Sequence, residues 1–214
     1  MTPRDGAATA SAKAKESLEK NPGRDPSGKI PPRERILAAA RELFYSQGIR
    51  AVGVEAIAEA AQTNKMTLYR HFSSKDELVA EYLRRFADEE EAVWSCIAGA
   101  HPGDPLAQLR AWVQRMAQEV SNPDSRGCAL ANAGVQIPEA DHPARCVIEN
   151  NKRTNRAHVV SLCRDSGLRD PELVADGLFL MLEGARVNIQ SEGHNGPACR
   201  FVALSEDLIT SHGR

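Results

Sequence analysis

The sequence has 214 residues and is 42% hydrophobic, which suffices for one large or two modest folded domains. It has no signal-peptide core, and no apolar run approaches the roughly 20 residues that span a bilayer. We therefore expect a cytoplasmic protein with no membrane partner. Its net charge of −2 is unevenly distributed, because residues 1–86 carry 15 Lys and Arg against 11 Asp and Glu and the other residues carry 12 against 18, as in a protein whose basic end faces phosphate.

The first 30 residues are rich in Ala, Ser, Gly, Pro and Lys and contain almost no large aliphatic side chain. Such a segment buries too little apolar surface to offset the entropy that is lost on ordering. We predict a disordered N-terminal tail over residues 1–30. A flexible arm that helps to hold DNA is the alternative to a merely solvated tail, and its cations would be Lys13, Lys15, Lys20, Arg24 and Lys29.

A three-helix unit is predicted over residues 31–76. Pro31 and Pro32 suit the entry of a first helix, whose apolar side ends before a stop at Gly48 and consists of Ile36, Ala40, Leu43 and Phe44. A second helix is predicted next, because apolar residues recur at i, i+3, i+4 and i+7. These residues are Val54, Ile57, Ala58 and Ala61.

The short turn QTN interrupts the second helix, and Asn64 suits the N-cap of a third helix that begins at Lys65. Leu68 and Phe72 form its small inward face, so the opposite face is free to enter a DNA major groove. Its basic and hydroxyl side chains suit phosphate oxygens. The predicted DNA-binding residues are Lys65, Met66, Thr67, Tyr69, Arg70, His71 and Lys75. The alternative is a plain helical hairpin with a solvated basic face, which does not explain why the apolar pattern, the turn and the run TLYRHF coincide.

The run IAEAA, followed after the turn by KMTLYRHFSSKDEL, resembles the TetR family of bacterial one-component transcriptional regulators. The match is specific over about residues 33–86. The resemblance implies DNA contacts by Thr67, Tyr69, His71 and Lys75, and it places the family's variable base-reading positions at Lys65, Met66 and Arg70. It also implies a homodimer that binds double-stranded DNA at a palindromic operator.

Three residues depart from the family pattern. Gly53 replaces the usual Thr or Ser that caps the second helix and touches phosphate, and Met66 replaces a small residue or Pro. Gln62 replaces the common turn Gly, so we expect a left-handed backbone there at a cost of roughly 1 kcal/mol. Met66 offers an apolar contact, for instance to a thymine methyl, instead of a hydrogen bond.

The rest of the chain, residues 77–214, is predicted to be a helical ligand-binding and dimerisation bundle. Ser74 and Glu77 form a capping-box pattern for a long helix that leaves the three-helix unit, and five more helices are expected near 105–120, 127–136, 143–165, 171–192 and 196–211. No segment shows sustained strand alternation. The fold class is therefore all-α, with an N-terminal helix-turn-helix domain, a C-terminal bundle and about nine helices.

The segments RGCALANAGVQIP, ADHPAR and GLRDPELVADGLFLMLEGA also resemble a C-terminal domain type of some TetR-like regulators. In that family the last two helices of each subunit form a four-helix dimer interface. Here both helices are apolar over a broad surface, and Gly177 and Gly184 suit close helix approach. An intramolecular core is the alternative, but a helix apolar on more than one side at the end of the chain favours a two-fold interface.

The resemblance further implies a cavity in the body for an unknown small organic ligand. Apolar walls with a few polar groups suit such a molecule, and the candidate ligand-binding residues are Trp94, Trp112, Met116, Asn132 and Phe179. Ordinary core packing is the alternative for each of them. Arg186 and Asn188 interrupt an otherwise apolar helix and suit either an acidic ligand group or a partner across the dimer.

The five cysteines are far apart and form no metal-ligand spacing, so we expect reduced core thiols, with a redox sensor or a soft-metal site as the alternative. We predict no cofactor and no metal site. The sequence contains no GxSxG, HExxH, phosphate loop or Rossmann glycine pattern, which argues against a small helical enzyme. An interaction module with a non-functional DNA reader is the remaining alternative. The leading prediction is a repressor that a ligand releases from its operator.

Overall fold

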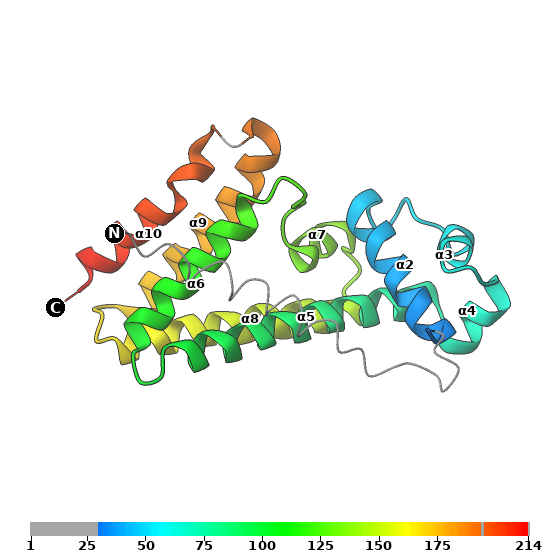
Figure 1. Ribbon diagram of the computed structural model, residues 1–214, viewed down its shortest axis with the longest axis horizontal. Helices are drawn as coiled ribbons and strands as arrows, with labels where there is room; N and C mark the ends of the chain where they lie inside the picture. Colours follow the sequence, from blue (N-terminus) through cyan, green and yellow to red (C-terminus); the bar gives the residue numbers. More distant parts are fainter. Residues whose placement is uncertain (1–29, 194, 214) are drawn as a thin grey trace, which may run out of the picture.

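The computed structural model describes residues 30–193 and 195–213, and within these ranges the chain forms nine α-helices, one short 3-10 helix and no strand (Figure 1). Ile30 apart, the predicted N-terminal tail lies outside the described residues. The all-α prediction is confirmed. The elements are α2 (Pro32–Gln47), α3 (Val54–Ala60), α4 (Lys65–His71), α5 (Lys75–Ala100), α6 (Pro105–Val120), α7 (Ala129–Gln136), α8 (Pro143–Asp165), α9 (Pro171–Glu192), η1 (Pro197–Arg200) and α10 (Phe201–Ser211).

Most predicted helix bounds agree with the structure, and two differ. The helix expected near 127–136 begins at Ala129, because Gly127 has a φ of +80° and cannot belong to a right-handed helix. The single helix expected near 196–211 is divided into η1 and α10. Pro197 starts this segment in the tighter 3-10 form, and the α-helix proper begins at Phe201.

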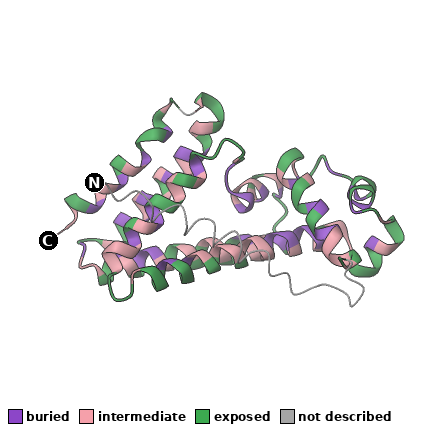
Figure 2. Cartoon of the chain, viewed as in Figure 1, coloured by how far each residue is buried: buried purple, intermediate pink, exposed green. Residues whose placement is uncertain are grey.

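Helices α2, α3 and α4, called here the N-terminal domain, share one apolar core with the first turns of α5 and with α7 (Figure 2). The inward residues predicted for α4 are deeply buried, with Leu68 0% and Phe72 2% exposed. Leu78, Val79 and Leu83 of α5 complete this core and are all 0% exposed. The predicted domain boundary at residues 76 and 77 therefore falls inside a helix whose start is packed into the N-terminal domain.

Side-chain caps define the starts of several helices. The Asn64 side chain accepts a hydrogen bond from the Thr67 amide at 2.9 Å, as the sequence predicts. At α5 the Ser74 hydroxyl accepts from the Glu77 amide at 3.0 Å. The reciprocal half of the predicted capping box is not formed, because the Glu77 carboxylate pairs with Arg84 one to two turns along α5, at 2.9 Å. A charged partner competes successfully with the single backbone amide.

Gln62, in the turn between α3 and α4, has a φ of +51°, the left-handed conformation expected from the sequence. Only glycine adopts this region without steric penalty. We predict that Gln62→Gly stabilises the protein by about 1 kcal/mol in urea unfolding. The matched control is Gln118→Gly at an exposed position inside α6, which should cost about 1 kcal/mol. A destabilised Gln62→Gly variant would contradict the assignment of strain to this turn.

The long helices α5 and α8 lie side by side and connect the N-terminal domain to the far end of the molecule (Figure 1). There α6, α9, η1 and α10 pack around them in a second apolar core. This second group of helices, α6 and α8 to α10, is called the body. Within the described part of the chain no helix is both long and apolar enough to cross a membrane.

The cysteines correct one expectation. Cys128 and Cys163 are buried, but Cys96, Cys146 and Cys199 are exposed, so three of the five are not core thiols. Burial raises the pKa of the Cys163 thiol to about 11 and raises that of Cys128 as well. These two buried sulfurs are therefore protonated near neutral pH and act as small apolar side chains.

Candidate nucleic-acid interface and cavity

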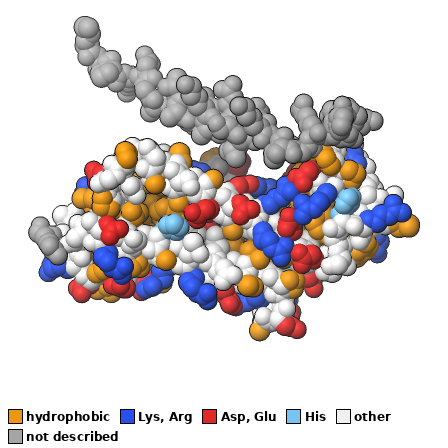
Figure 3. Space-filling view, turned by 90° about the horizontal axis from the view of Figure 1, so that it is seen from below, with side chains coloured by type: hydrophobic (Ala, Val, Ile, Leu, Met, Phe, Trp, Pro, Cys, Tyr) orange, Lys and Arg blue, Asp and Glu red, His pale blue; other side chains and the backbone are white. Residues whose placement is uncertain are grey.

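The outward face of α4 carries most of the residues that the sequence assigns to DNA. Leu68 and Phe72 hold the helix against the core, so the residues between and opposite them face solvent. Thr67 is half-buried beside the α4 N-cap, and the exposed members of the set are Lys65, Met66, Tyr69, Arg70 and His71. Figure 3 shows Lys, Arg and His side chains on this end of the molecule, with carboxylates among them.

Met66 is the most exposed apolar residue of this surface, at 71%. Gly53, the N-cap residue of α3, has an extended backbone and provides no side-chain cap. The hydroxyl that the family pattern places there is absent.

Lys65 is held by an acid from the preceding helix. Its Nζ lies 2.6 Å from the Glu55 carboxylate and 6.0 Å from the centroid of the Tyr69 ring. The hydrogen bond to Glu55 raises the pKa of Lys65 and, reciprocally, lowers that of Glu55. Glu55 is not among the residues predicted from the sequence, because a helical pattern does not show which side chain of the next helix lies opposite.

Lys75 differs from the other predicted DNA contacts, because its ammonium is turned toward the protein. Its Nζ donates to the Ile49 carbonyl at 2.6 Å and lies 6.0 Å from the Phe44 ring centroid. Burial lowers the pKa of Lys75. In this arrangement Lys75 ties the start of α5 to the loop after α2, beside the surface formed by α4.

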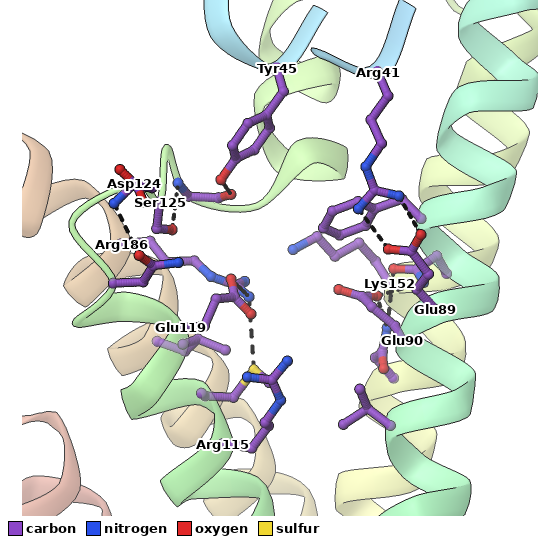
Figure 4. A pocket seen from close by; sticks show the side chains of 18 of the residues that line it. Arg41, Tyr45, Glu89, Glu90, Arg115, Glu119, Asp124, Ser125, Lys152 and Arg186 are labelled. Carbon is purple, nitrogen blue, oxygen red and sulfur yellow. Dashed lines mark hydrogen bonds and ion pairs between the residues drawn. The ribbon is translucent and has the colours of Figure 1, made fainter. Parts of the chain in front are cut away.

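A cavity of about 620 Å³ lies between the N-terminal domain and the body. Its walls come from α2, α5, α6, α8 and α9 and from the loop between α6 and α7 (Figure 4). Four of the five predicted ligand-binding residues line it: Trp94, Trp112, Met116 and Phe179. Their helices start far apart in the sequence, and the packing of the body brings them together.

Aromatic rings form the apolar wall of this cavity. Trp94 and Trp112 stack with centroids 5.9 Å apart and an interplanar angle of 8°. Phe179 leans on Trp112 at 5.5 Å, and His158 stacks on the other tryptophan at 5.0 Å. The Trp94 indole nitrogen donates to the Asn155 side chain at 2.5 Å. The wall is therefore held in place by both stacking and a hydrogen bond.

Asn132 does not line this cavity. It belongs to α7, which packs on the N-terminal domain, and its amide donates to the Arg126 carbonyl at 2.7 Å. It lines instead a second, more polar cavity of about 720 Å³ between α2, α7 and the end of α9. The sequence shows Asn132 within a helix but gives no sign of which neighbour that helix packs against.

The remaining walls of the first cavity are charged, and most of their groups are already paired (Figure 4). Arg41 forms a two-pronged pair with Glu89, of which the Nη2–Oε2 distance is 2.8 Å. The Glu90 carboxylate accepts from the amides of Asn151 and Asn155, each at 2.8 Å. Both of its partners are neutral amides, so no cation is paired with Glu90 at this wall.

Arg186 is the most deeply buried cation of the cavity wall, at 6% exposed. Its Nη2 lies 2.9 Å from Glu119 and its Nη1 lies 3.2 Å from Glu183, which also pairs with Lys152 at 2.5 Å. The buried Nε has no hydrogen-bond partner among the described residues. The sequence left two alternative partners for Arg186, an acidic ligand group or a residue across the dimer. The structure shows a third, an ion-pair network within one chain.

Sequence reasoning missed the contribution of the N-terminal domain to this cavity. Arg41 and Tyr45 of α2 line it, although the pattern of α2 showed only an apolar side toward the core. The Tyr45 hydroxyl donates to the Gly127 carbonyl at 3.1 Å and accepts from the Arg126 amide at 2.7 Å. Tyr45 thus joins α2 to the loop before α7.

Helix α8 carried a sequence signal for the cavity that was not used. Its polar residues Asn151 and Asn155 have the spacing i, i+4, which places them on one face of the helix, and both line the cavity.

The outer face of α9 exposes a regular apolar stripe. Leu173, Leu180 and Val187 are 61%, 75% and 66% exposed and lie seven residues apart, so they share one face of the helix. A Cβ added at Gly184 would meet nothing within 4 Å, whereas one at Gly177 would collide with Leu208 of α10 at 2.8 Å. Gly177 therefore allows the close packing of α9 on α10, and Gly184 opens the exposed face. Leu204 of α10 is also 50% exposed.

Comparison with known proteins supplies the family. Residues 36–82 match the sequence model of the family described as "Bacterial regulatory proteins, tetR family". The HTH-type transcriptional repressor KstR2 of Mycobacterium tuberculosis (strain ATCC 25618 / H37Rv) is 43% identical over 191 residues, which span 85% of this chain and 94% of KstR2. The HTH-type transcriptional activator FasR of Mycolicibacterium smegmatis is 31% identical over 162 residues, spanning 72% of this chain and 70% of FasR.

A solved structure shows the same fold over most of the chain. A TetR-family transcriptional regulator from Streptomyces coelicolor superposes with a TM-score of 0.77 at 27% identity, covering 86% of this chain and 96% of the other. Relatives and structures agree over both the N-terminal domain and the body. The chain therefore belongs to the TetR family of bacterial regulatory proteins and is a DNA-binding transcriptional regulator rather than an enzyme.

Proposed function

We propose that the protein is a dimeric repressor that binds a palindromic operator and is released when a small organic molecule fills the cavity between its domains. The observation that carries this proposal is the position of α2. The helix packs under α4 in the N-terminal core and also lines the cavity with Arg41 and Tyr45. A molecule in the cavity therefore touches the domain that holds DNA.

The exposed face of α4 supports the DNA-binding part of the proposal. Arg70 and Lys65 suit a guanine edge, and Met66 suits a thymine methyl. Thr67, Tyr69 and His71 suit phosphate oxygens, which fix the position on the duplex without reading sequence. Lys75 joins this set only if its ammonium leaves the Ile49 carbonyl on binding, since a lysine donates in three directions from a flexible stem.

The α9 stripe supports the dimer. A two-fold pairing of α9 and α10 with their copies would cover Leu173, Leu180, Val187 and Leu204 in one interface. Two α4 helices related by that axis match two half-sites of a palindrome about one helical turn apart. KstR2 is named a repressor and FasR an activator; we propose repression because the more similar relative over the longer alignment is the repressor.

The cavity supports an organic ligand with an aromatic or alicyclic body and a few hydrogen-bonding groups. Its aromatic wall offers stacking, while the Glu90 carboxylate offers an acceptor. For the ligand to release DNA, it must bind the DNA-free form more tightly, commonly by about 1–3 kcal/mol. A ligand with equal affinity for both forms would change nothing.

Selection of genomic fragments by the purified protein tests the DNA-binding part. We expect enriched fragments that share a two-fold symmetric motif with half-sites one helical turn apart. Both tryptophans of the chain, Trp94 and Trp112, line the cavity. A compound library can therefore be screened by intrinsic fluorescence, and the compounds that change it are then tested for release of the selected fragment. Enrichment of unrelated fragments would support the alternative of an interaction module with a non-functional DNA reader.

Tyr45→Phe is expected to separate ligand binding from DNA release. The variant loses the two hydrogen bonds that the Tyr45 hydroxyl makes to the loop before α7 but keeps the ring that lines the cavity. With a compound found by fluorescence, we expect ligand affinity to stay within about threefold while the ligand's effect on operator affinity shrinks by about tenfold, as for loss of a coupling of about 1.4 kcal/mol.

The matched control is Ser46→Ala. Ser46 also lines the cavity, but its hydroxyl donates only within α2, to the carbonyls of Glu42 and Leu43, and its backbone contact to the Arg126 side chain survives the substitution. This variant should respond to the compound like the wild type. An unchanged response in Tyr45→Phe would show that the signal does not pass through this contact.

A further inference from the structure

An ion pair joins the two helices of the helix-turn-helix on the surface that faces DNA. Glu55 lies in the first turn of α3 and Lys65 is the first residue of α4, and their charged atoms are 2.6 Å apart. Their side chains are 70% and 53% exposed. Tyr69, one turn further along α4, lies beside the same ammonium.

Stability alone does not explain this pair. An exposed ion pair between long side chains contributes little to stability, because water screens it and both side chains lose freedom. Lys65 also stands at the N-terminal end of its helix, where the helix dipole disfavours a cation. The Lys65 ammonium is therefore stabilised by groups outside its own helix, namely Glu55 and any acceptor that approaches α4.

The carboxylate is equally out of place for simple phosphate binding. Helix α4 contains no acid, and its polar residues are basic, hydroxyl or aromatic. A carboxylate beside it is repelled by the phosphates of the duplex and weakens binding to every sequence alike. The N4 amine of cytosine, in the major groove, can offset that repulsion, because it donates a hydrogen bond to a Glu or Asp carboxylate.

A cytosine–guanine pair presents this donor next to two acceptors. In the major groove cytosine offers the N4 amine, and guanine offers O6 and N7, which accept from Lys or Arg. The Glu55–Lys65 pair offers the complementary set, an acceptor next to an ammonium with three donors. We propose that Glu55 and Lys65 act together to read one C·G base pair of the operator, with the carboxylate on cytosine and the ammonium on guanine.

In the DNA-free protein the pair holds both groups in the arrangement that the base pair needs. On binding, each group exchanges part of its contact with the other for a contact with its base. The donor on cytosine thus stabilises the Glu55 carboxylate, which the phosphates alone would repel. This inference rests on the proposed DNA-binding function and adds Glu55, a residue of the supporting helix, to the residues that determine sequence preference.

The test uses the full-length protein and duplexes that carry each of the four base pairs at every position of the selected motif. For the wild type we expect one position at which C·G is preferred by about tenfold. Glu55→Gln keeps the size of the side chain and removes its charge, and Lys65→Met removes the ammonium. Both variants should lose the preference at that same position and keep it at the others.

Glu59→Gln is the matched control, because Glu59 is exposed on the same helix and undergoes the same change of charge. It should leave every base preference unchanged. If Glu55→Gln instead strengthens binding to all sequences by one common factor, Glu55 is only a tether that weakens phosphate contacts, and the inference is wrong. Loss of preference at two different positions in the two variants would also overturn joint reading.

Failure of the proposed function gives a different result. A wild-type protein that binds the selected motif and random duplex equally would reject sequence-specific DNA binding itself, before any variant is compared. A wild type that discriminates strongly at other positions, with no C·G preference that responds to Glu55 or Lys65, would reject this inference alone.

Discussion

Leu180→Glu is expected to convert the proposed dimer into monomers and to weaken operator binding by about a hundredfold or more. Leu180 is the most exposed residue of the α9 stripe, at 75% in the isolated chain. In a two-fold interface the substitution acts twice, because each copy loses a buried leucine worth about 1.5–3 kcal/mol and places a carboxylate against its symmetry mate. Two half-sites are then bound independently, which removes an avidity of about 10²–10⁴.

Sedimentation equilibrium at micromolar concentration measures the first effect and an operator titration the second. Gln114→Glu, at an exposed position of α6, adds the same charge away from the stripe and should remain dimeric. Circular dichroism establishes that both variants keep their helices. A dimeric Leu180→Glu protein with unchanged operator affinity would place the interface elsewhere.

Arg186→Ala is expected to destabilise the fold by about 3 kcal/mol, the lower end of the cost of removing one partner from a buried ion pair. Arg186 neutralises Glu119 and Glu183 beneath the cavity, and both carboxylates remain when it is removed. Their side chains are 28% and 36% exposed, so water relieves part of the cost. Arg164→Ala is the control, because the Arg164–Glu172 pair is largely exposed, so its loss should change stability little.

The pH dependence of the Arg186→Ala effect has a definite sign. Burial alone would raise the pKa of Glu183, but Lys152 and Arg186 hold it below the ordinary value of 4.5. The stabilisation is therefore present above pH 4.5 and is lost as the pH falls through the lowered pKa of the folded state. Urea unfolding at neutral and acidic pH should show the two proteins converging at low pH. A difference that is no larger than that of Arg164→Ala at neutral pH would contradict the assigned network.

The sequence determines the N-terminal domain almost completely, because the signals there are local. Asn64 caps α4, Gln62 takes the left-handed turn, and Leu68 and Phe72 face the core, as their spacing and chemistry predict. The nine α-helices found among the described residues were likewise predictable from prolines, glycines and periodicity. Each of these signals acts within a few residues of the chain.

The cavity and the charged contacts were less predictable, because they depend on which helices meet. Trp94, Trp112 and Phe179 were identified as apolar residues of three helices, but nothing in the sequence brings Arg41 and Tyr45 of α2 to the same cavity. Asn132 was misplaced for the same reason, because the packing of α7 on the N-terminal domain turns it to the second cavity.

The contact of the Lys75 ammonium with the Ile49 carbonyl and the Glu55–Lys65 ion pair are also tertiary contacts. Each joins residues at least ten positions apart in the chain, across a turn or a loop. A helical pattern shows which face a residue occupies and leaves open which residue of another helix stands opposite. Long polar side chains are the hardest to place, since several partners lie within their reach.

The central claim, that α4 places a sequence-specific reader on DNA, is tested most directly by one titration. Purified protein is titrated with the duplex upstream of its own gene and with a random duplex of equal length, each at two salt concentrations. We expect tight binding to the first duplex, much weaker binding to the second, and a log–log salt dependence of both that reports several phosphate contacts. Equal, weak binding to both duplexes and to every genomic fragment selected in parallel would contradict the account.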